Sequence, residues 1–290
     1  MTTFVCTGNT GKIQEYFAYL GGKKAANLVG IDDMEESSGL LFVEPEENYN
    51  FFLGNGFLKL ASSLRFVADT IARGEDSDPE IVERIIVDDS GLCVPALNFE
   101  PGVHSAYYGG QPRGADRNRL RLREEIARIH GKNLAEEPQI DVRVPGFFVC
   151  FILSAKVSKE MLREVLSPSF RIRDFRSAPL EAIEKDVINR VTQDIAEGKN
   201  AGGSFHSSVK WSELYVGLPV QGSFAIDFGY CLGEVSTQEQ ALIPGAGHGY
   251  DNMYYAKQHP QLSFASIPME QKNAESHRSL AMQSLQKHPV

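Results

Sequence analysis

Hydrophobic residues follow two different spacings along the chain, and together they predict a mixture of strands and helices. Compact apolar runs rich in β-branched and aromatic residues predict buried strands. These runs lie at 3–6, 27–31, 85–87, 146–153 and 228–235. Apolar residues that recur every three or four positions predict helices with one buried stripe. Such segments lie at 13–20, 52–61, 118–129, 159–166 and 180–197.

The apolar run at 85–87 leads directly into two carboxylates, Asp88 and Asp89, which Ser90 and Gly91 follow. This pattern predicts a buried strand that ends in an acidic turn, where catalytic groups are often exposed. Adjacent carboxylates ionise reluctantly together unless a cation neutralises them, and a divalent metal would do so. A solvated turn is the alternative interpretation, because Asp, Ser and Gly all suit turns.

A second polar segment, Thr7-Gly8-Asn9-Thr10-Gly11-Lys12, connects the first predicted strand to the first predicted helix. Such a turn directs backbone N–H groups and the positive end of the helix toward a ligand, and Lys12 adds a full positive charge. The segment therefore predicts a phosphate site, although its spacing matches neither a Walker loop nor a dinucleotide fingerprint. A simple capped turn is the alternative.

Composition and charge argue against some classes of function. The chain of 290 residues has a net charge of −9, so we expect no nucleic acid partner. Its four scattered cysteines form no CxxC pair, which suits reduced thiols in a cytoplasmic protein. We find neither a signal peptide pattern nor an apolar stretch of about 20 residues, and we expect no membrane association.

Two acidic residues, Glu46 and Glu47, precede the helical pattern that carries Lys59 near its middle. Taken alone, they also fit a solvated helix start, where carboxylates favour the positive end of the helix dipole. Beyond this helix, the polar segment 73–79 predicts an exposed loop between two helical pieces.

The carboxyl-terminal part carries a second group of candidate binding residues. Glycines in the segment 244–251 allow close backbone approach to a ligand, and Tyr250 offers an aromatic ring for stacking on a base. Ser276 predicts the N-cap of a helix, so His277 and Arg278 would lie in its first turn beside free N–H groups. With Lys272 nearby, these donors suit a triphosphate or a carbonyl-bearing purine.

Several of these segments, in this order, resemble the motifs of the inosine triphosphate pyrophosphatase family, the Ham1-like enzymes that remove deaminated purine nucleotides. The resemblance rests on Thr7-Gly8-Asn9, Asp88-Asp89-Ser90-Gly91-Leu92, Pro101-Gly102, Ser105-Ala106 and Met269–Ala281. It implies an α/β fold with an elongated central mixed sheet flanked by helices, and two lobes with a nucleotide-binding cleft between them. It also implies a homodimer that hydrolyses ITP, dITP or XTP, with Mg²⁺, to the monophosphate and pyrophosphate.

The resemblance also implies roles for particular residues. Asp89, Lys12 and Lys59 are expected to be catalytic, and Glu47, Asp88 and Asp89 are expected to bind Mg²⁺. The residues expected to bind the nucleoside triphosphate substrate are Thr7, Gly8, Asn9, Ser90, His248, Gly249, Tyr250, Asp251, Lys272, His277 and Arg278.

The chain departs from the family's pattern at several motif positions. Gly54 stands where a glutamate is usual, and Tyr107 stands where an arginine is usual. His248 replaces a phenylalanine and Asn252 replaces a proline. We expect these changes to affect metal binding, phosphate contacts or base preference.

We expect a single domain over 1–290, with an insertion over 155–225 for which a lid and a partner surface are both open. Two alternative functions also remain open. One is a related pyrophosphatase that acts on another nucleotide. The other is a nucleotide-binding or interaction protein in which catalysis has decayed.

Overall fold

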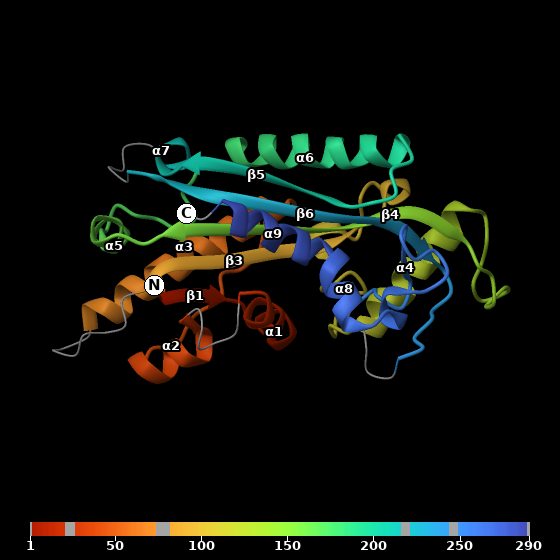
Figure 1. The fold of residues 1–290 in the computed structure, drawn as a ribbon, viewed down its shortest axis with the longest axis horizontal. Coiled ribbons are helices and arrows are strands. Elements are labelled where there is room, and N and C mark those ends of the chain that lie inside the picture. Colours follow the sequence, from red (N-terminus) through yellow and green to blue (C-terminus); the bar gives the residue numbers. More distant parts are fainter. Residues whose placement is uncertain (1, 21–26, 74–81, 216–220, 244–248, 289–290) are drawn as a thin grey trace.

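One mixed sheet of seven strands runs along the length of the molecule (Figure 1). The computed structural model describes residues 2–20, 27–73, 82–215, 221–243 and 249–288. The strands are β1 (Thr2–Cys6), β2 (Leu28–Val29), β3 (Val82–Cys93), β4 (Arg143–Lys156), β5 (Gly203–Lys210), β6 (Ser223–Ser236) and β7 (Tyr254–Ala256). Their order is β2-β1-β3-β4-β6-β5, and β7 pairs with β6. Because β1 is parallel to β2 and β3 while the other pairs are antiparallel, the expected mixed sheet is confirmed.

Helices cover both faces of this sheet. They are α1 (Thr10–Tyr19), α2 (Ile31–Ser38), α3 (Phe52–Arg73), α4 (Ala115–Ile129), α5 (Lys159–Leu166), α6 (Ala178–Ala196), α7 (Trp211–Leu214), α8 (Met269–Glu275) and α9 (His277–Lys287). Side chains of α1 and α9 share one buried cluster with β1, β3 and β4, and side chains of α3 and α6 share another cluster with the opposite face. Figure 1 shows α9 crossing the middle of the sheet, and α4 and α8 near one end of the sheet.

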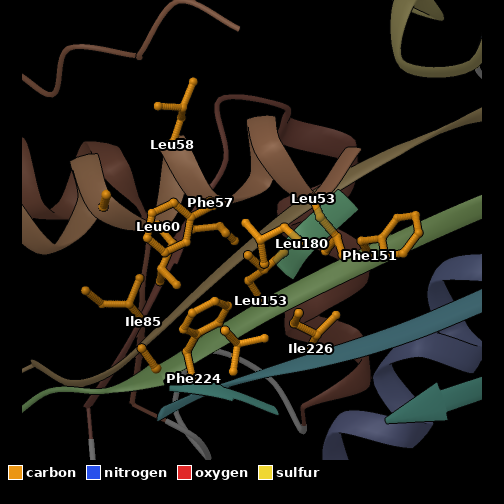
Figure 2. Close-up of a cluster of buried hydrophobic side chains, with 14 of the residues drawn as sticks. Leu53, Phe57, Leu58, Leu60, Ile85, Phe151, Leu153, Leu180, Phe224 and Ile226 are labelled. Carbon is orange, nitrogen blue, oxygen red and sulfur yellow. The ribbon is translucent and has the colours of Figure 1, made fainter. Parts of the chain in front are cut away.

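The apolar stripe of α3 forms the centre of the larger core (Figure 2). Leu53, Phe57 and Leu60 recur at helical spacing and have no exposed surface. They pack with Phe151 and Leu153 of β4, which are equally buried. Burial of each such side chain stabilises the fold by about 1.5–3 kcal/mol. The core therefore fixes α3, and with it Lys59, against the sheet.

Strand β3 continues through the acidic pair, so the prediction of an acidic turn is wrong. Its pairing with β4 runs without interruption from Arg84 to Cys93, and Asp88 and Asp89 lie opposite Ile152 and Phe151. Pairing with the long antiparallel strand β4 outweighs the turn preference of these residue types. Since side chains alternate along a strand, the two carboxylates point to opposite faces of the sheet.

Two other local predictions are also wrong. Only Leu28 and Val29 form a strand within the expected run 27–31, and Ile31 already begins helix α2. The loop predicted at 73–79 lies, from residue 74 onward, outside the described residues, and the next described element is strand β3 at Val82 rather than a helical piece. Asp32 and Asp33 in the first turn of α2 favour this helix, because they face the positive end of its dipole.

The segment 155–225 contributes to the main core. Strand β5 pairs with β6 over its whole length and forms an edge of the sheet. Leu180, Val187 and Val191 of α6 belong to the same buried cluster as Leu53 and Phe57 of α3. The described part of this segment is therefore packed into the sheet and its core. None of the helices in the described part of the chain is both long enough and apolar enough to span a membrane.

Candidate active site

A cavity of about 730 Å³ lies beside β3, beyond the point where the neighbouring strand β1 ends. Strand β1 ends at Cys6, which pairs with Val87, so no described strand pairs with Asp88 to Leu92 on that side. Groups from both faces of the sheet can reach this open edge. The volume lies in the usual range for a small-molecule site.

The cavity brings together most of the residues predicted from the sequence. Those that line it are Thr7, Gly8, Asn9, Lys12, Glu47, Lys59, Asp89, Ser90, Gly249, Tyr250, Asp251, Lys272, His277 and Arg278. Asp88 is not among the described lining residues, and its side chain is fully buried. His248 lies outside the described residues.

On the α3 face, one ammonium group joins two carboxylates. Lys59 Nζ lies 2.7 Å from Glu47 Oε1 and 3.7 Å from Asp89 Oδ1. Burial alone would lower the pKa of Lys59, but the charges of Asp89 and Glu47 outweigh it and raise that pKa. Lys59 is therefore a permanent cation that holds the two carboxylates near one another.

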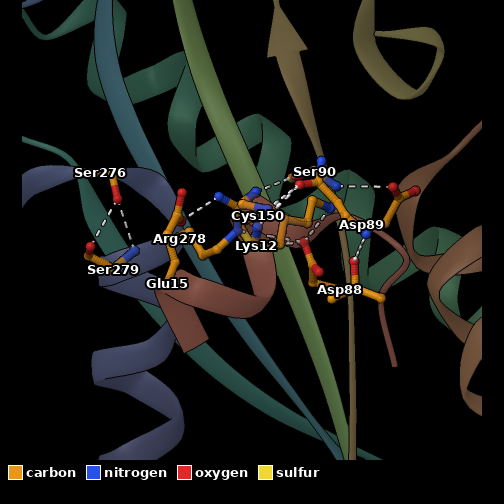
Figure 3. Close-up of polar contacts among 12 residues, drawn as sticks. Lys12, Glu15, Asp88, Asp89, Ser90, Cys150, Ser276, Arg278 and Ser279 are labelled. Atoms are coloured by element: carbon orange, nitrogen blue, oxygen red, sulfur yellow. Dashed lines mark hydrogen bonds and ion pairs between the residues drawn. The ribbon is translucent and has the colours of Figure 1, made fainter. Parts of the chain in front are cut away.

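On the α1 and α9 face, two cations converge on Asp88 (Figure 3). Lys12 Nζ lies 2.7 Å from Asp88 Oδ2, and Arg278 Nε lies 3.8 Å from the same oxygen. Burial opposes ionisation of Asp88, but Lys12 and Arg278 outweigh it and lower the pKa of this carboxyl group. Asp88 therefore positions both cations at the floor of the cavity.

Two further contacts fix the guanidinium of Arg278. Arg278 Nη1 lies 2.6 Å from Glu15 Oε2, and Nη2 donates to Ser90 Oγ at 3.2 Å. Ser276 accepts a hydrogen bond from Ser279 N, which confirms it as the N-cap of α9. Because Arg278 lies in the first turn of this helix, its charge adds to the positive end of the helix dipole.

The N-terminal loop is a strand-to-helix turn, as predicted, and Asn9 caps the helix. Its Oδ1 accepts hydrogen bonds from the backbone N–H groups of Gly11 and Lys12, at 3.0 and 3.2 Å. These N–H groups are consequently satisfied within the loop. The side chain of Lys12, rather than the start of α1, is thus the positive group that this segment offers to a phosphate.

At the far end of the cavity, His277 stacks on Phe148 with ring centroids 5.0 Å apart and an interplanar angle of 16°. Burial and the nearby Arg278 charge lower the pKa of His277 well below its usual range, so its imidazole is neutral. Its Nδ1 is buried and has no hydrogen-bond partner among the described residues. His277 thus adds a neutral ring to the residues that line the cavity.

Neighbouring residues support the same end of the site. Lys272 forms an ion pair with Asp251. The Tyr250 hydroxyl donates to the backbone oxygen of Ser105 at 2.9 Å, and the Tyr250 side chain is buried. Tyr250 therefore anchors the segment that carries Ser105, and Lys272, Asp251 and His277 are among the polar residues that line the cavity.

Arg113 is a lining residue that the sequence analysis did not identify. Its guanidinium lies 5.3 Å from the ring centroid of Tyr107, the residue that stands where an arginine is usual. Glu44, Phe148 and Asn273 also line the cavity without having been predicted. Asn273 lies within the carboxyl-terminal motif and was detectable there, whereas no local pattern marks Arg113.

Close packing of two aromatic rings explains the glycine at position 54. A Cβ atom at this position would lie 2.6 Å from Cγ of Tyr49 and 2.7 Å from Cζ of Phe51. The two rings therefore occupy the space that a larger side chain would need.

Both carboxylate oxygens of Glu184 accept hydrogen bonds from Phe52 N and Leu53 N at the start of α3.

The acidic pair formed by Glu47 and Asp89 fits a divalent metal ion. Burial raises the pKa of Asp89 to about 6, against the opposing charge of Lys59. Asp89 Oδ2 is buried without a hydrogen-bond partner among the described residues. A buried carboxylate oxygen that lacks a partner is costly unless a ligand satisfies it. Carboxylate oxygens are also the ligands that Mg²⁺ prefers.

Comparison with protein families gives a match over most of the chain. A model described as the Ham1 family matches residues 3–152 and 168–288. The dITP/XTP pyrophosphatase of Nitrosomonas europaea is 31% identical over 129 residues, 44% of this chain and 52% of the relative. That of Zymomonas mobilis is 35% identical over 118 residues, 41% of this chain and 46% of the relative. The chain thus spans about half the length of the curated relatives it matches.

Two solved structures share the fold. A HAM1 protein from Coxiella burnetii aligns with a TM-score of 0.59 and 18% identity, over 99% of this chain and 98% of that one. The Ham1 protein of Staphylococcus aureus aligns with a TM-score of 0.54 and 21% identity, over 99% and 97% of the two chains. At these identities the likeness concerns the fold alone.

Proposed function

The chain belongs to the Ham1 family, and from this premise we propose that it hydrolyses non-standard purine nucleoside triphosphates to a monophosphate and pyrophosphate. The observation that carries the proposal is one cavity lined both by the cations Lys12, Lys59 and Arg278 and by the carboxylates of Glu47 and Asp89. Three cations in one cavity suit a polyanionic substrate, and the acidic pair suits the metal that such a substrate brings with it.

We assign the metal, Mg²⁺, to Glu47 and Asp89. When bound there, it would supply positive charge that offsets the negative charge developing on the phosphate oxygens. Asp88, which the sequence also assigns to the metal, is left out of this proposal. Its Oδ2 is already held by Lys12, and its side chain points to the other face of the sheet.

The phosphates would lie among the cations at the open edge of β3. Lys12 and Arg278 approach this edge from one face of the sheet and Lys59 from the other. Because these side chains are fixed by Asp88, Glu15 and Glu47, they need little rearrangement when the charge on the phosphates grows.

Asp89 is our candidate for the general base. It would accept a proton from the attacking water, whose oxygen forms a bond to the α-phosphorus while the bond to the β-phosphate oxygen breaks. Its buried carboxyl group has a pKa of about 6, close to the range in which a base works at neutral pH. The products are then the monophosphate and pyrophosphate.

The purine base would lie at the end of the cavity that His277 and Lys272 line. The Lys272 ammonium is a hydrogen-bond donor, and the oxygen on C6 of hypoxanthine or xanthine is an acceptor. Adenine has a donor amino group at the same place, so it could not accept this hydrogen bond. This difference supports a preference for 6-oxo purines.

We further propose that the protein is a cytoplasmic homodimer. The described cysteines are all buried and free, which suits a reducing compartment. Light scattering of the purified chain gives the mass directly. A mass equal to one chain at micromolar concentration would contradict the dimer.

The activity is tested by pyrophosphate release with Mg²⁺ from ITP, XTP, dITP, ATP, GTP and dUTP, for the native chain and for Asp89→Asn. We expect release from ITP, dITP and XTP that Asp89→Asn abolishes. Release from another nucleotide alone would retain the mechanism and change the substrate. No release from any nucleotide, with binding retained, would overturn the proposed enzyme and favour a binding protein.

A further inference from the structure

A second group of metal-binding residues lies outside the cavity, at the carboxyl end of α9. His206 on β5 and Asp227 on β6 pair directly across the sheet, and His288 follows the last residue of α9. One donor atom from each of the three side chains lies within 4.8 Å of the others. The proposed substrate-binding residues Arg278 and His277 lie in the first turn of the same helix, about 15 Å away at 1.5 Å per residue.

The aspartate at the centre of this group has an unused oxygen. Asp227 has no exposed side-chain surface, and its Oδ2 has no hydrogen-bond partner among the described residues. Its Oδ1 accepts a hydrogen bond from Ser284 Oγ at 2.6 Å and lies 2.9 Å from His206 Nδ1. Such a buried carboxylate is stable only with a cation or further donors close by.

Arg84 is a cation near this carboxylate, but it forms no ion pair with Asp227. Its Nη2 donates to Ser154 Oγ at 3.3 Å. Arg84 Nε is itself buried without a partner among the described residues. Asp227 Oδ2 therefore keeps coordination capacity, while Oδ1 is the oxygen that both histidines approach.

The spacing of the donors suits a small divalent ion. Ligand atoms about 2.0–2.2 Å from a tetrahedral ion lie about 3.3 Å apart. His206 Nδ1 and His288 Nδ1 lie 2.9 and 3.9 Å from Asp227 Oδ1, on either side of that value. The His288 side chain is 46% exposed, and its Nδ1 would exchange its present 3.0 Å hydrogen bond to the backbone oxygen of Ser284 for the metal ion.

The two imidazole rings are placed to act together. They stack with centroids 4.1 Å apart and an interplanar angle of 19°. Two imidazoles and one carboxylate, open to solvent on one side, are a donor set typical of Zn²⁺.

We propose that His206, Asp227 and His288 bind one Zn²⁺ ion, which ties the carboxyl end of α9 to strands β5 and β6. Ser284 supports the site by holding Asp227 Oδ1. The site is distinct from the proposed Mg²⁺ site, whose ligands are all oxygens. Its role is structural, because it fixes the helix that carries Arg278 at its other end.

The test is a calorimetric titration of Zn²⁺ into the chelator-treated full chain, in excess Mg²⁺ so that the oxygen-lined site is saturated. We expect one Zn²⁺ per chain and a Zn²⁺-dependent rise in Tm. His206→Gln and His288→Gln should each weaken binding by about tenfold or more. Both side chains are partly exposed, so the variants keep the core intact. His130→Gln, at an exposed histidine that ends α4, is the matched control.

Co²⁺ provides a second readout that does not depend on affinity. Four-coordinate Co²⁺ absorbs visible light strongly, and we expect this absorption from the native chain and from His130→Gln only. The proposal is overturned if the native chain binds no Zn²⁺ under these conditions. It is also overturned if His206→Gln and His288→Gln bind Zn²⁺ as tightly as the native chain. Neither outcome depends on nucleotide hydrolysis.

Discussion

Asp88 and Asp89 are consecutive on β3, yet their carboxylates lie on opposite faces of the sheet and contact different cations. Asp88 contacts Lys12 at 2.7 Å, and Asp89 approaches Lys59 at 3.7 Å. The alternation of side chains along a strand produces this division. We therefore assign one carboxylate to the positioning of cations and the other to the metal and the water.

This division predicts different defects for the two isosteric variants. Asp89→Asn should lower kcat by about 10²–10⁴-fold through loss of the base. It should also raise the Mg²⁺ concentration that gives half-maximal activity. Asp88→Asn should lower kcat/KM by about 10–100-fold, because Lys12 and Arg278 are misplaced, with the Mg²⁺ requirement unchanged. Equal increases in the Mg²⁺ requirement for both variants would make Asp88 a metal ligand.

The pKa of Asp89 predicts how activity depends on pH. Burial raises this pKa to about 6, and the base must be ionised to accept a proton. At low Mg²⁺, kcat/KM should therefore fall as the pH drops through about 6. A bound cation favours the ionised carboxylate and lowers its pKa, so saturating Mg²⁺ should move the fall to lower pH. Profiles at two Mg²⁺ concentrations check this, and identical profiles would count against metal binding at Asp89.

Arg113 is expected to supply a cation that the sequence motif lacks at Tyr107. Arg113→Ala should raise KM for the preferred triphosphate by about tenfold, as for loss of one charge-assisted contact, with little change in kcat. Arg128→Ala is the matched control, because Arg128 is a largely exposed arginine on α4. An unchanged KM for Arg113→Ala would remove this residue from the site.

Glu184 is expected to stabilise the start of α3. Glu184→Ala leaves two buried N–H groups unpaired and should lower the free energy of unfolding by about 2 kcal/mol. Glu181→Ala, on the exposed face of the same helix, should change it by less than about 0.5 kcal/mol. Urea unfolding of both variants gives the two values.

The same residue predicts a pH dependence of stability. Burial raises the pKa of Glu184 from its ordinary 4.5 to about 7. Between these pH values the folded chain holds the proton and the unfolded chain does not, so stability should decrease as the pH rises through this window. Glu184→Gln cannot ionise and should lack this component. A native chain whose stability parallels that of Glu184→Gln from pH 4.5 to 7 would contradict the raised pKa.

The close contact at Gly54 predicts a packing defect. Gly54→Ala should destabilise the fold by about 1–3 kcal/mol, because the new Cβ would overlap the ring of Tyr49. Thermal unfolding measures this cost. Ala61→Gly, at a buried alanine of the same helix, should cost about 1 kcal/mol through helix propensity and about 0.8 kcal/mol more through loss of a buried methyl group. A Gly54→Ala variant as stable as the native chain would show that the two rings can move aside.

The sequence by itself determined the strands and helices whose apolar patterns were long. The runs at 146–153 and 228–235 became β4 and β6, and the amphipathic segments near 52–61 and 180–197 became α3 and α6. Ser276 was identified as an N-cap from its residue type and position. Ordered polar motifs also identified most of the residues that line the cavity. These features depend on local chemistry, which a linear sequence contains.

Only the tertiary structure decided which face each group occupies. The acidic pair looked like a turn, but its pairing with β4 made it part of a strand and separated Asp88 from Asp89. Arg113 lines the cavity, and Glu184 accepts hydrogen bonds at the start of α3, because segments far apart in the sequence pack together. Strand register and helix packing set these distances, and both depend on partners far along the chain, so no local pattern could reveal them.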